Sequence, residues 1–324
     1  MKLIYKVSFL ALSLLFGLTS CDHLIFDNLE DCPRGIYVRL YSQTECADSP
    51  SYPEQIRETN YFVFDEETGL LVALHRDENQ TLTADKEVYI PISRSKGVFR
   101  VIAWSGIASD LFETSSVQIG KTSLSDLYSI LNTEKGTPFS VDLKDRTVWM
   151  GQSPIVVVQP LRKETPKDYH VAVNMREITN RITVRVTGLK KPTDFVILME
   201  SANGRYGFDG TIPAHSAYKY PALTSYPADL KDMARAFFTT LKLESGRKSI
   251  ITVFNTDKNK IAFQDDLIGA ILMSPKDASL NLRCLNDYDI HLKMRYCPTC
   301  PGEAAIAQIW INDWLVHSYD ISFD

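Results

Sequence analysis

Cysteine is the residue type in this chain whose spacing could do chemistry. Cys297 and Cys300 form a Cys-x-x-Cys pair, which can act as a redox couple or supply half of a zinc site. A redox couple needs a helix N-terminus to lower the pKa of its first thiol, but Pro301 and Gly302 follow the pair directly. A four-cysteine zinc site needs a second such pair, which the sequence lacks. We therefore expect a structural disulfide or a buried thiol at this motif.

Cys21 follows a segment organised like a secretory signal peptide. Lys2 and Lys6 precede an apolar stretch over residues 7–18, which is shorter than the roughly 20 residues of a transmembrane helix. The stretch ends in Leu-Thr-Ser-Cys, the pattern at which lipoprotein precursors are cleaved and the new N-terminal thiol is acylated. The alternative is an ordinary signal peptide that ends near a cysteine. We expect residues 1–20 to be removed and lipid on Cys21 to hold the chain to a membrane.

The remaining five cysteines are an odd number, so at least one thiol stays unpaired within a monomer. In an oxidising cell envelope, disulfides are the default state of such residues. Their clustering favours a bond near the start, between Cys32 and Cys46, and a bond near the end, between Cys284 and either Cys297 or Cys300. Spacing alone leaves this connectivity open.

Several functional classes are disfavoured by charge and motifs. The formal net charge is -5, and no long run of Lys or Arg could bind a phosphate backbone, so nucleic acid is not an expected partner. No histidine is spaced from another histidine or a cysteine like a pair of metal ligands. The nucleophile-elbow, phosphate-loop and dinucleotide motifs are absent, and Asn203-Gly204 indicates a turn. We expect neither an enzyme nor a bound cofactor or metal.

The elements that must position these residues are β-strands. Apolar and polar side chains alternate over residues 36–40 and 182–186, as in half-buried strands. Further strands are expected at residues 61–64, 70–74, 87–90, 98–104, 155–158, 195–199, 237–243, 249–254 and 290–296. The sequence from Asp65 to Gly69 is typical of a hairpin turn. Helices are expected only at residues 123–131 and 260–272, so we predict an all-β fold of sandwiches.

Length and proline content indicate two domains. The part of the chain after residue 20 is about twice the ~150 residues of a typical domain. Pro154, Pro160 and Pro166 lie within a charged segment that resembles a linker or a strand crossover. We therefore place an N-terminal sandwich at residues 21–158 and a C-terminal sandwich at residues 159–324.

The C-terminus is predicted to be a hairpin, with strands at residues 305–311 and 314–323 around Asn312-Asp313. Leu315, Tyr319, Ile321 and Phe323 share one face of the second strand. Chain ends usually fray into polar sequence, so an apolar face that continues to the end must be docked. It can dock in its own sheet or, by strand addition, in the sheet of another subunit. Both alternatives stay open.

These features together resemble the FimB-type fimbrial anchor family of Bacteroidales over nearly the whole chain. The resemblance is carried by residues 21–40 with Asp31-Cys32-Pro33, Phe62-Val63-Phe64-Asp65, Ala103-Trp104-Ser105-Gly106, Trp149-Met150-Gly151, residues 176–189 with Thr179-Asn180-Arg181-Ile182, and Ile309-Trp310-Ile311-Asn312-Asp313-Trp314. It implies two transthyretin-like β-sandwich domains with a few short helices. It also implies that lipid on Cys21 fixes the base of a surface-exposed fimbria in the outer membrane, with stalk pilins as partners.

The resemblance also implies a mechanism. Stalk pilins of this class lose their first strand to an arginine-specific protease, which opens a groove for the C-terminal strand of a neighbour. Residues 36–40 would here be a retained first strand, so that assembly ends at this subunit, and residues 315–323 would be the donated strand. The alternative is a surface lipoprotein adhesin, or a fimbrial tip subunit, that binds a glycan or a host protein.

Overall fold

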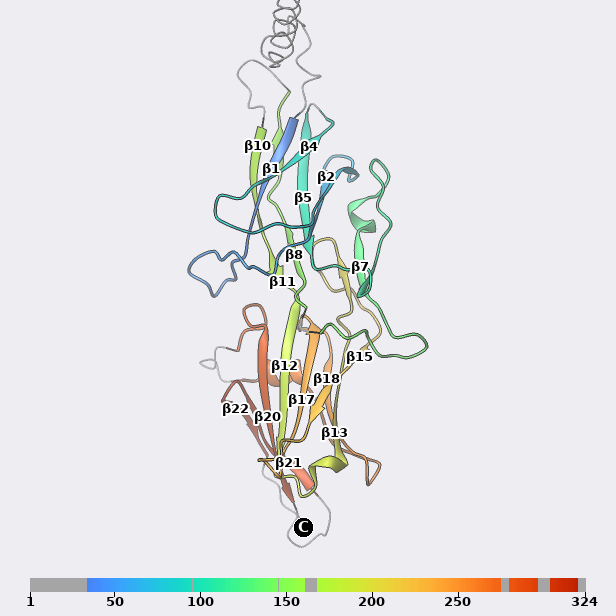
Figure 1. The fold of residues 1–324 in the computed structure, drawn as a ribbon, viewed down its shortest axis with the longest axis vertical. Helices are drawn as coiled ribbons and strands as arrows, with labels where there is room; N and C mark the ends of the chain where they lie inside the picture. Colours follow the sequence, from blue (N-terminus) through green and yellow to red (C-terminus); the bar gives the residue numbers. More distant parts are fainter. Residues whose placement is uncertain are drawn as a thin grey trace, which may run out of the picture.

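The structure, a computed structural model, describes residues 34–94, 96–144, 146–160, 168–274, 280–296 and 304–319. These residues form an elongated, strand-rich molecule (Figure 1). The described chain enters at one end of the long axis with β1 (Arg34–Tyr41), and its last strand, β22 (Trp314–Ser318), belongs to the opposite half. Among the described residues no helix has the length and apolarity needed to cross a membrane.

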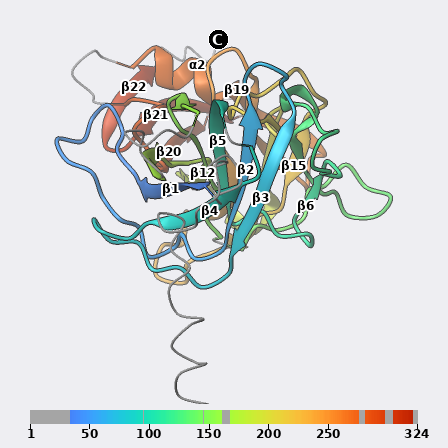
Figure 2. The same ribbon diagram turned by 90° about the horizontal axis from the view of Figure 1, so that it is seen from above.

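Two sheets form the half of the molecule that contains β1. In the first, β1 lies between β10 (Asp168–Asn174), to which it is parallel, and β4 (Val88–Ile92), to which it is antiparallel. The second sheet has the order β11-β8-β5-β2-β3, with β9 also paired to β5. Its strands are β2 (Thr59–Asp65), β3 (Leu71–Asp77), β5 (Gly97–Ser105), β8 (Trp149–Gln152), β9 (Val156–Val158) and β11 (Arg176–Glu177). Seen along the long axis, β2 and β3 lie side by side, and β4 lies between β3 and β1 (Figure 2).

Strand β2 is buried on both faces, which explains its continuous apolar sequence. Tyr61 and Val63 face the core shared with β1, where Ile36 and Val38 are buried. Phe62 faces the other way and packs against Trp104 of β5, with ring centroids 5.4 Å apart. Each fully buried side chain of this kind contributes roughly 1.5–3 kcal/mol.

The segment between β5 and β8 covers that second face and connects the two halves. It contains β6 (Phe112–Thr114), the 3-10 helix η2 (Leu124–Asp126) and β7 (Tyr128–Leu131). Strand β7 pairs with β6 on one side and with β14 (Arg205–Gly207) on the other. The apolar core of the second half therefore extends without a break under this segment.

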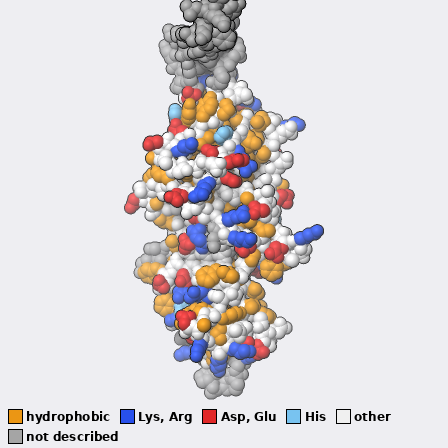
Figure 3. All heavy atoms as spheres, viewed as in Figure 1, with side chains coloured by type: hydrophobic (Ala, Val, Ile, Leu, Met, Phe, Trp, Pro, Cys, Tyr) orange, Lys and Arg blue, Asp and Glu red, His pale blue; other side chains and the backbone are white. Residues whose placement is uncertain are grey.

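The second half contains a sheet of order β16-β17-β12-β20-β21-β22 and a sheet of order β15-β13-β18-β19. Their further strands are β12 (Thr179–Thr187), β13 (Phe195–Ser201), β15 (Tyr218–Tyr220), β16 (Leu223–Ser225), β17 (Ala234–Leu241), β18 (Ser249–Asn255), β19 (Lys260–Asp266), β20 (Asp287–Tyr296) and β21 (Ala304–Ile311). The 3-10 helix η3 (Pro192–Asp194) precedes β13, and helix α2 (Leu267–Leu272) follows β19. Acidic and basic side chains are interspersed along the visible face (Figure 3).

The all-β prediction is confirmed, but both predicted helices are largely wrong. Residues 123–131 contain only η2 before the chain continues as β7, because Ser129 and Leu131 are buried between two partner strands. Residues 260–266 are strand β19, and only Leu267–Leu272 is helical. Asp266 begins that helix, since its side chain accepts a hydrogen bond from the Ile268 amide.

Strand pairing also differs from the boundary placed between residues 158 and 159. Strands β10 and β11 follow that point, yet they pair with β1 and β8 of the first half. The chain passes into the second half only at β12, directly after Ile178. The physical reason is that Val171 and Val173 complete the sheet of β1, so the proline-rich segment leads back into the first half.

Candidate functional site

The strand that the resemblance assigns as retained is held on both sides. From Gly35 onwards β1 is paired with β10, and from Arg34 to Val38 it is paired with β4. Arg34, the first described residue, is buried. Its guanidinium donates hydrogen bonds to the Gln159 carbonyl oxygen and, over 3.1 Å, to the Tyr169 hydroxyl, and it lies over the Tyr169 ring. The start of β1 is thus tied to residues on either side of the segment 161–167.

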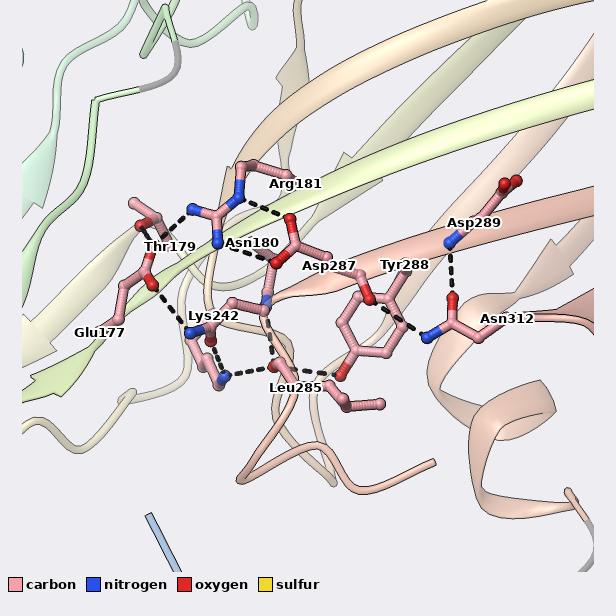
Figure 4. A network of polar contacts seen from close by, with 11 residues as sticks. Glu177, Thr179, Asn180, Arg181, Lys242, Leu285, Asp287, Tyr288, Asp289 and Asn312 are labelled. Atoms are coloured by element: carbon pink, nitrogen blue, oxygen red, sulfur yellow. Dashed lines mark hydrogen bonds and ion pairs between the residues drawn. The ribbon is translucent and has the colours of Figure 1, made fainter. Parts of the chain in front are cut away.

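The C-terminal hairpin is formed by β21 and β22, as predicted. Asn312 and Asp313 both have positive φ, 47° and 66°, the combination that a tight two-residue hairpin turn requires. The Asn312 side chain accepts a 2.7 Å hydrogen bond from the Asp289 amide and donates one of 3.2 Å to the Asp287 carbonyl oxygen (Figure 4). The turn is therefore attached to the start of β20.

Strand β22 lies at the edge of its own sheet, paired only with β21. A bulge at Val316 interrupts the alternation expected from the sequence, so that Val316 packs against the core whereas Leu315 lies opposite Trp310. Leu315 is 38% exposed and Tyr319 is 39% exposed. Ile321 and Phe323 lie outside the described residues. Donation of this strand to another subunit stays a prediction.

A polar network lies where the chain crosses between the halves (Figure 4). The buried carboxylate of Glu177 on β11 accepts hydrogen bonds from Thr179 (2.7 Å), Arg181 (2.6 Å) and Asn286 (2.8 Å). Arg181 also donates two hydrogen bonds to the carboxylate of Asp287, and this contact raises the pKa of the guanidinium above its ordinary value. Charge-assisted bonds of this kind are shorter and stronger than neutral ones.

Lys242, directly after β17, completes the network. Its ammonium group donates hydrogen bonds to the Leu285 carbonyl oxygen, over 2.7 Å, and to the Asn286 side chain. Burial lowers the pKa of Lys242 to about 8. Asn180, also buried, accepts a 2.7 Å hydrogen bond from the Leu243 amide. These contacts fix the loop that precedes β20 against β11 and β12.

A disulfide joins the two halves beside this network. Cys46, in the loop after β1, is bonded to Cys284, in the loop before β20. The favoured pairs Cys32–Cys46 and Cys284 with Cys297 or Cys300 are therefore wrong. The physical reason is the fold: β1 pairs with β10 and β20 pairs with β12, which brings together two loops that are 238 residues apart in sequence.

The other cysteines singled out in the sequence, Cys21, Cys32, Cys297 and Cys300, lie outside the described residues. Within the described ranges, side chains able to bind a metal ion gather at Glu45, Cys46 and Cys284. Both sulfur atoms of that group are used by the disulfide, so no thiolate is available there.

Sequence reasoning missed the polar network entirely. Glu177 and Arg181 are four residues apart and carry a weak signal of an ion pair, but Lys242 and Asp287 come from distant segments. A hint was available in Asn180, because it is a polar residue in phase with the buried Ile182 and Val184 of β12.

Comparison with solved structures defines the class of fold. The chain is similar to a putative adhesin from Bacteroides ovatus, with a TM-score of 0.68 and 16% identity over 89% of this chain and 95% of the other. It is also similar to a putative polysaccharide binding protein from Bacteroides thetaiotaomicron, with a TM-score of 0.67 and 16% identity over 89% and 98% of the two chains. At this level of identity the likeness shows the fold alone, an all-β architecture shared by proteins described as adhesins.

A much stronger similarity identifies the family. The fimbrial anchor protein Mfa2 from Porphyromonas gingivalis matches with a TM-score of 0.81 and 38% identity over 89% of this chain and all of the other. The sequence of the minor fimbrium anchoring subunit Mfa2 from that organism is 39% identical over 306 residues, 94% of this chain and 92% of the relative. Residues 29–320 match the family of fimbrillin-A associated anchor proteins Mfa1 and Mfa2. The chain belongs to this family, which confirms the predicted resemblance.

Proposed function

We propose that this protein anchors a fimbria to the outer membrane and ends its assembly. The observation that carries the proposal is the 39% identity, over 94% of the chain, to a minor fimbrium anchoring subunit. The arrangement of the molecule supports it, because the described chain begins at one end of the long axis, where the segment following Cys21 joins β1. Lipid on Cys21 would hold that end to the membrane, and the opposite half would hold the filament.

The retained first strand supports the role as a terminal subunit. An arginine-specific protease must draw an arginine side chain into its own pocket, but Arg34 is buried and hydrogen-bonded. The exposed Arg39 lies within β1, whose backbone is paired with β10. A subunit that keeps β1 has no empty groove for the strand of a neighbour, so growth stops at this subunit.

Replacing Cys21 tests the membrane anchor. The Cys21→Ala variant should release the protein, and the fimbriae attached to it, into the medium, because no thiol remains to receive lipid. Ser20→Ala is the matched control, since a small residue still precedes the cysteine. Immunoblots of membrane and medium fractions, with mass spectrometry of the mature N-terminus, provide the measurement. An unmodified Cys21 in the native protein would contradict the proposal.

The C-terminal strand is the proposed connection to the stalk pilin. Leu315 and Tyr319 already have exposed apolar surface, and Ile321 and Phe323 follow them. The double variant Ile321→Asn, Phe323→Asn should fold normally yet fail to copurify with fimbriae, because the apolar side chains that a receiving groove would bury are lost. In the control, Asp320→Asn with Asp324→Asn, the apolar face is unchanged. Equal recovery of both variants with fimbriae would show that the strand is not donated.

The position of the protein on the filament distinguishes an anchor from a tip adhesin. Immunogold labelling with an antibody to this chain should mark the end of the fimbria at the cell. Deletion of the gene should give shed or overlong fimbriae. Label at the distal end, with fimbrial length unchanged by the deletion, would instead support the adhesin alternative.

A further inference from the structure

Two lines of strands run in parallel across the junction between the halves. One is continuous in sequence: β10 leads through β11 into β12. The other is made of β1 and β20, which are parallel to β10 and β12 respectively. The Cys46–Cys284 bond joins the end of β1 to the start of β20, so the second line is also covalently continuous.

We propose that the Cys46–Cys284 disulfide carries tension from the N-terminus to the C-terminal strands and prevents that tension from pulling out the backbone between the two cysteines. Strand β1 runs from the end of the molecule toward the junction. Strands β20 and β22 both run away from the junction, because each is antiparallel to β21. A force applied at the two chain termini therefore passes along β1, through the disulfide and into β20, β21 and β22.

Without the disulfide, the force has only a long route, through a segment that is kept folded by noncovalent contacts. Without the disulfide, tension that frees β1 passes next into the loop after it, then into β2, and so along the backbone between the two cysteines, which are 238 positions apart. With the disulfide, that segment is bypassed, because both of its ends are fixed to each other. The backbone that contains β2 to β19 is then not pulled apart from its two ends, although β4, β10 and β12 stay hydrogen-bonded to β1 and β20.

The contacts beside the disulfide are too weak to replace it. Asn281 donates a 3.0 Å hydrogen bond to Glu45, and Arg283 forms a 3.4 Å ion pair with the same carboxylate. All three side chains are exposed or nearly so, and water and salt weaken such pairs. They orient the two loops, whereas the covalent bond is the part that resists separation. The mechanical role rests on the proposed function, since only an anchored filament would pull the two ends apart.

Single-molecule force spectroscopy on the mature chain, with handles at its two ends, tests the inference. Unfolding of the oxidised wild type should never release the segment between the cysteines. Reduction of the folded wild type should add roughly 800 Å to the total extension, from 238 residues at about 3.4 Å each. Full extension of the oxidised protein would overturn the inference.

Two double variants test whether the change in extension comes from the Cys46–Cys284 bond and not from another pair of cysteines. Cys46→Ala with Cys284→Ala should extend fully with or without reductant, and Cys297→Ala with Cys300→Ala should behave like the wild type. Peptide mapping without reduction should identify the 46–284 pair; a bond from Cys284 to Cys297 or Cys300 would overturn the proposal. Because reduction of the already folded wild type gives the same comparison, the test holds even if the first variant fails to fold.

An experiment on whole bacteria distinguishes a failure of this inference from a failure of the proposed function. Bacteria with Cys46→Ala and Cys284→Ala should assemble fimbriae in normal number but lose them at lower shear than wild-type cells. Equal shear resistance would contradict this mechanical role, although the short extension of the oxidised chain would persist. Fimbriae that assemble and remain attached without this protein would contradict the proposed function, while the force measurement on the purified chain would still stand.

Discussion

At the scale of single residues, Lys242 is a buried cation whose pKa is lowered by its surroundings. Its ammonium group lies in the polar network between the halves, and burial lowers its pKa to about 8. In the unfolded chain the pKa returns to about 10.4. Between these two values the unfolded state binds more protons than the folded state, so the stability contributed by this group rises with pH.

The free energy of unfolding should therefore rise with pH more steeply in the wild type than in the Lys242→Met variant, which lacks this titrating group. From pH 8 to pH 9.5 the wild type should gain about 1.5 kcal/mol relative to the variant, as measured by urea denaturation at each pH. The exposed residue Lys231 supplies the control, because Lys231→Met should follow the wild type. This window lies below the titration of Tyr206 and Tyr220, whose pKa values burial raises. Parallel pH profiles for wild type and Lys242→Met would contradict the assignment.

Local chemistry was predictable at this scale and distant contacts were not. The turn at Asp65 was expected from sequence, and its carboxylate indeed accepts hydrogen bonds from the amides of Glu67 and Thr68. The Cys46–Cys284 pair was not expected from sequence, since no residue near either cysteine indicates the other as its partner. Proximity in sequence favoured the wrong partners because loop closure is cheapest over short separations, but the sheets override that preference.

At the scale of elements, the turn between β21 and β22 offers a matched pair of substitutions. Asp313 has φ of 66°, which costs free energy for any residue with a Cβ atom, so Asp313→Gly should stabilise the protein by roughly 0.5–1 kcal/mol. Asn312→Gly relieves a similar strain but removes the two hydrogen bonds to β20, and it should destabilise the protein. Chemical denaturation of both variants provides the measurement; stabilisation by both would show that the Asn312 side chain contributes little.

Strands with clear alternation were predicted well and short ones were missed. Residues 36–40 and 182–186 show a period of two over enough residues to be recognised, and both are strands. Strands β6, β14, β15 and β16 have three residues each, too few to display any period. Their conformation is imposed by the neighbours they pair with, as for β14 beside β7.

At the scale of the whole molecule, the disulfide should dominate thermal stability. In the chain-entropy view, closing a loop of 238 residues stabilises the folded state by on the order of 5 kcal/mol. Reductant should therefore lower the melting temperature of the wild type to that of the Cys46→Ala, Cys284→Ala variant and leave the variant unchanged. A variant that also melts earlier in reductant would assign the effect to other cysteines. Calorimetry with and without reductant is the measurement.

Fold class followed from the sequence, but the path of the chain did not. Alternating strands and few helical patterns were enough to predict an all-β protein. The crossing point at Ile178 could not be seen, because β10 has the same alternating pattern whether it pairs within the first half or begins the second. The parallel pairing of β1 with β10 arises only when the sheets assemble, and no sequence pattern within either strand indicates it.

That pairing imposes an order on folding during export, when the chain emerges from its N-terminus. Strand β1 meets its antiparallel partner β4 early, but its other neighbour arrives only with Asp168, and the partner of Cys46 only at residue 284. Until then the thiol of Cys46 is closest in sequence to that of Cys32. Any bond that Cys46 formed earlier, such as one with Cys32, would have to be exchanged by thiol attack before the bond to Cys284 could close.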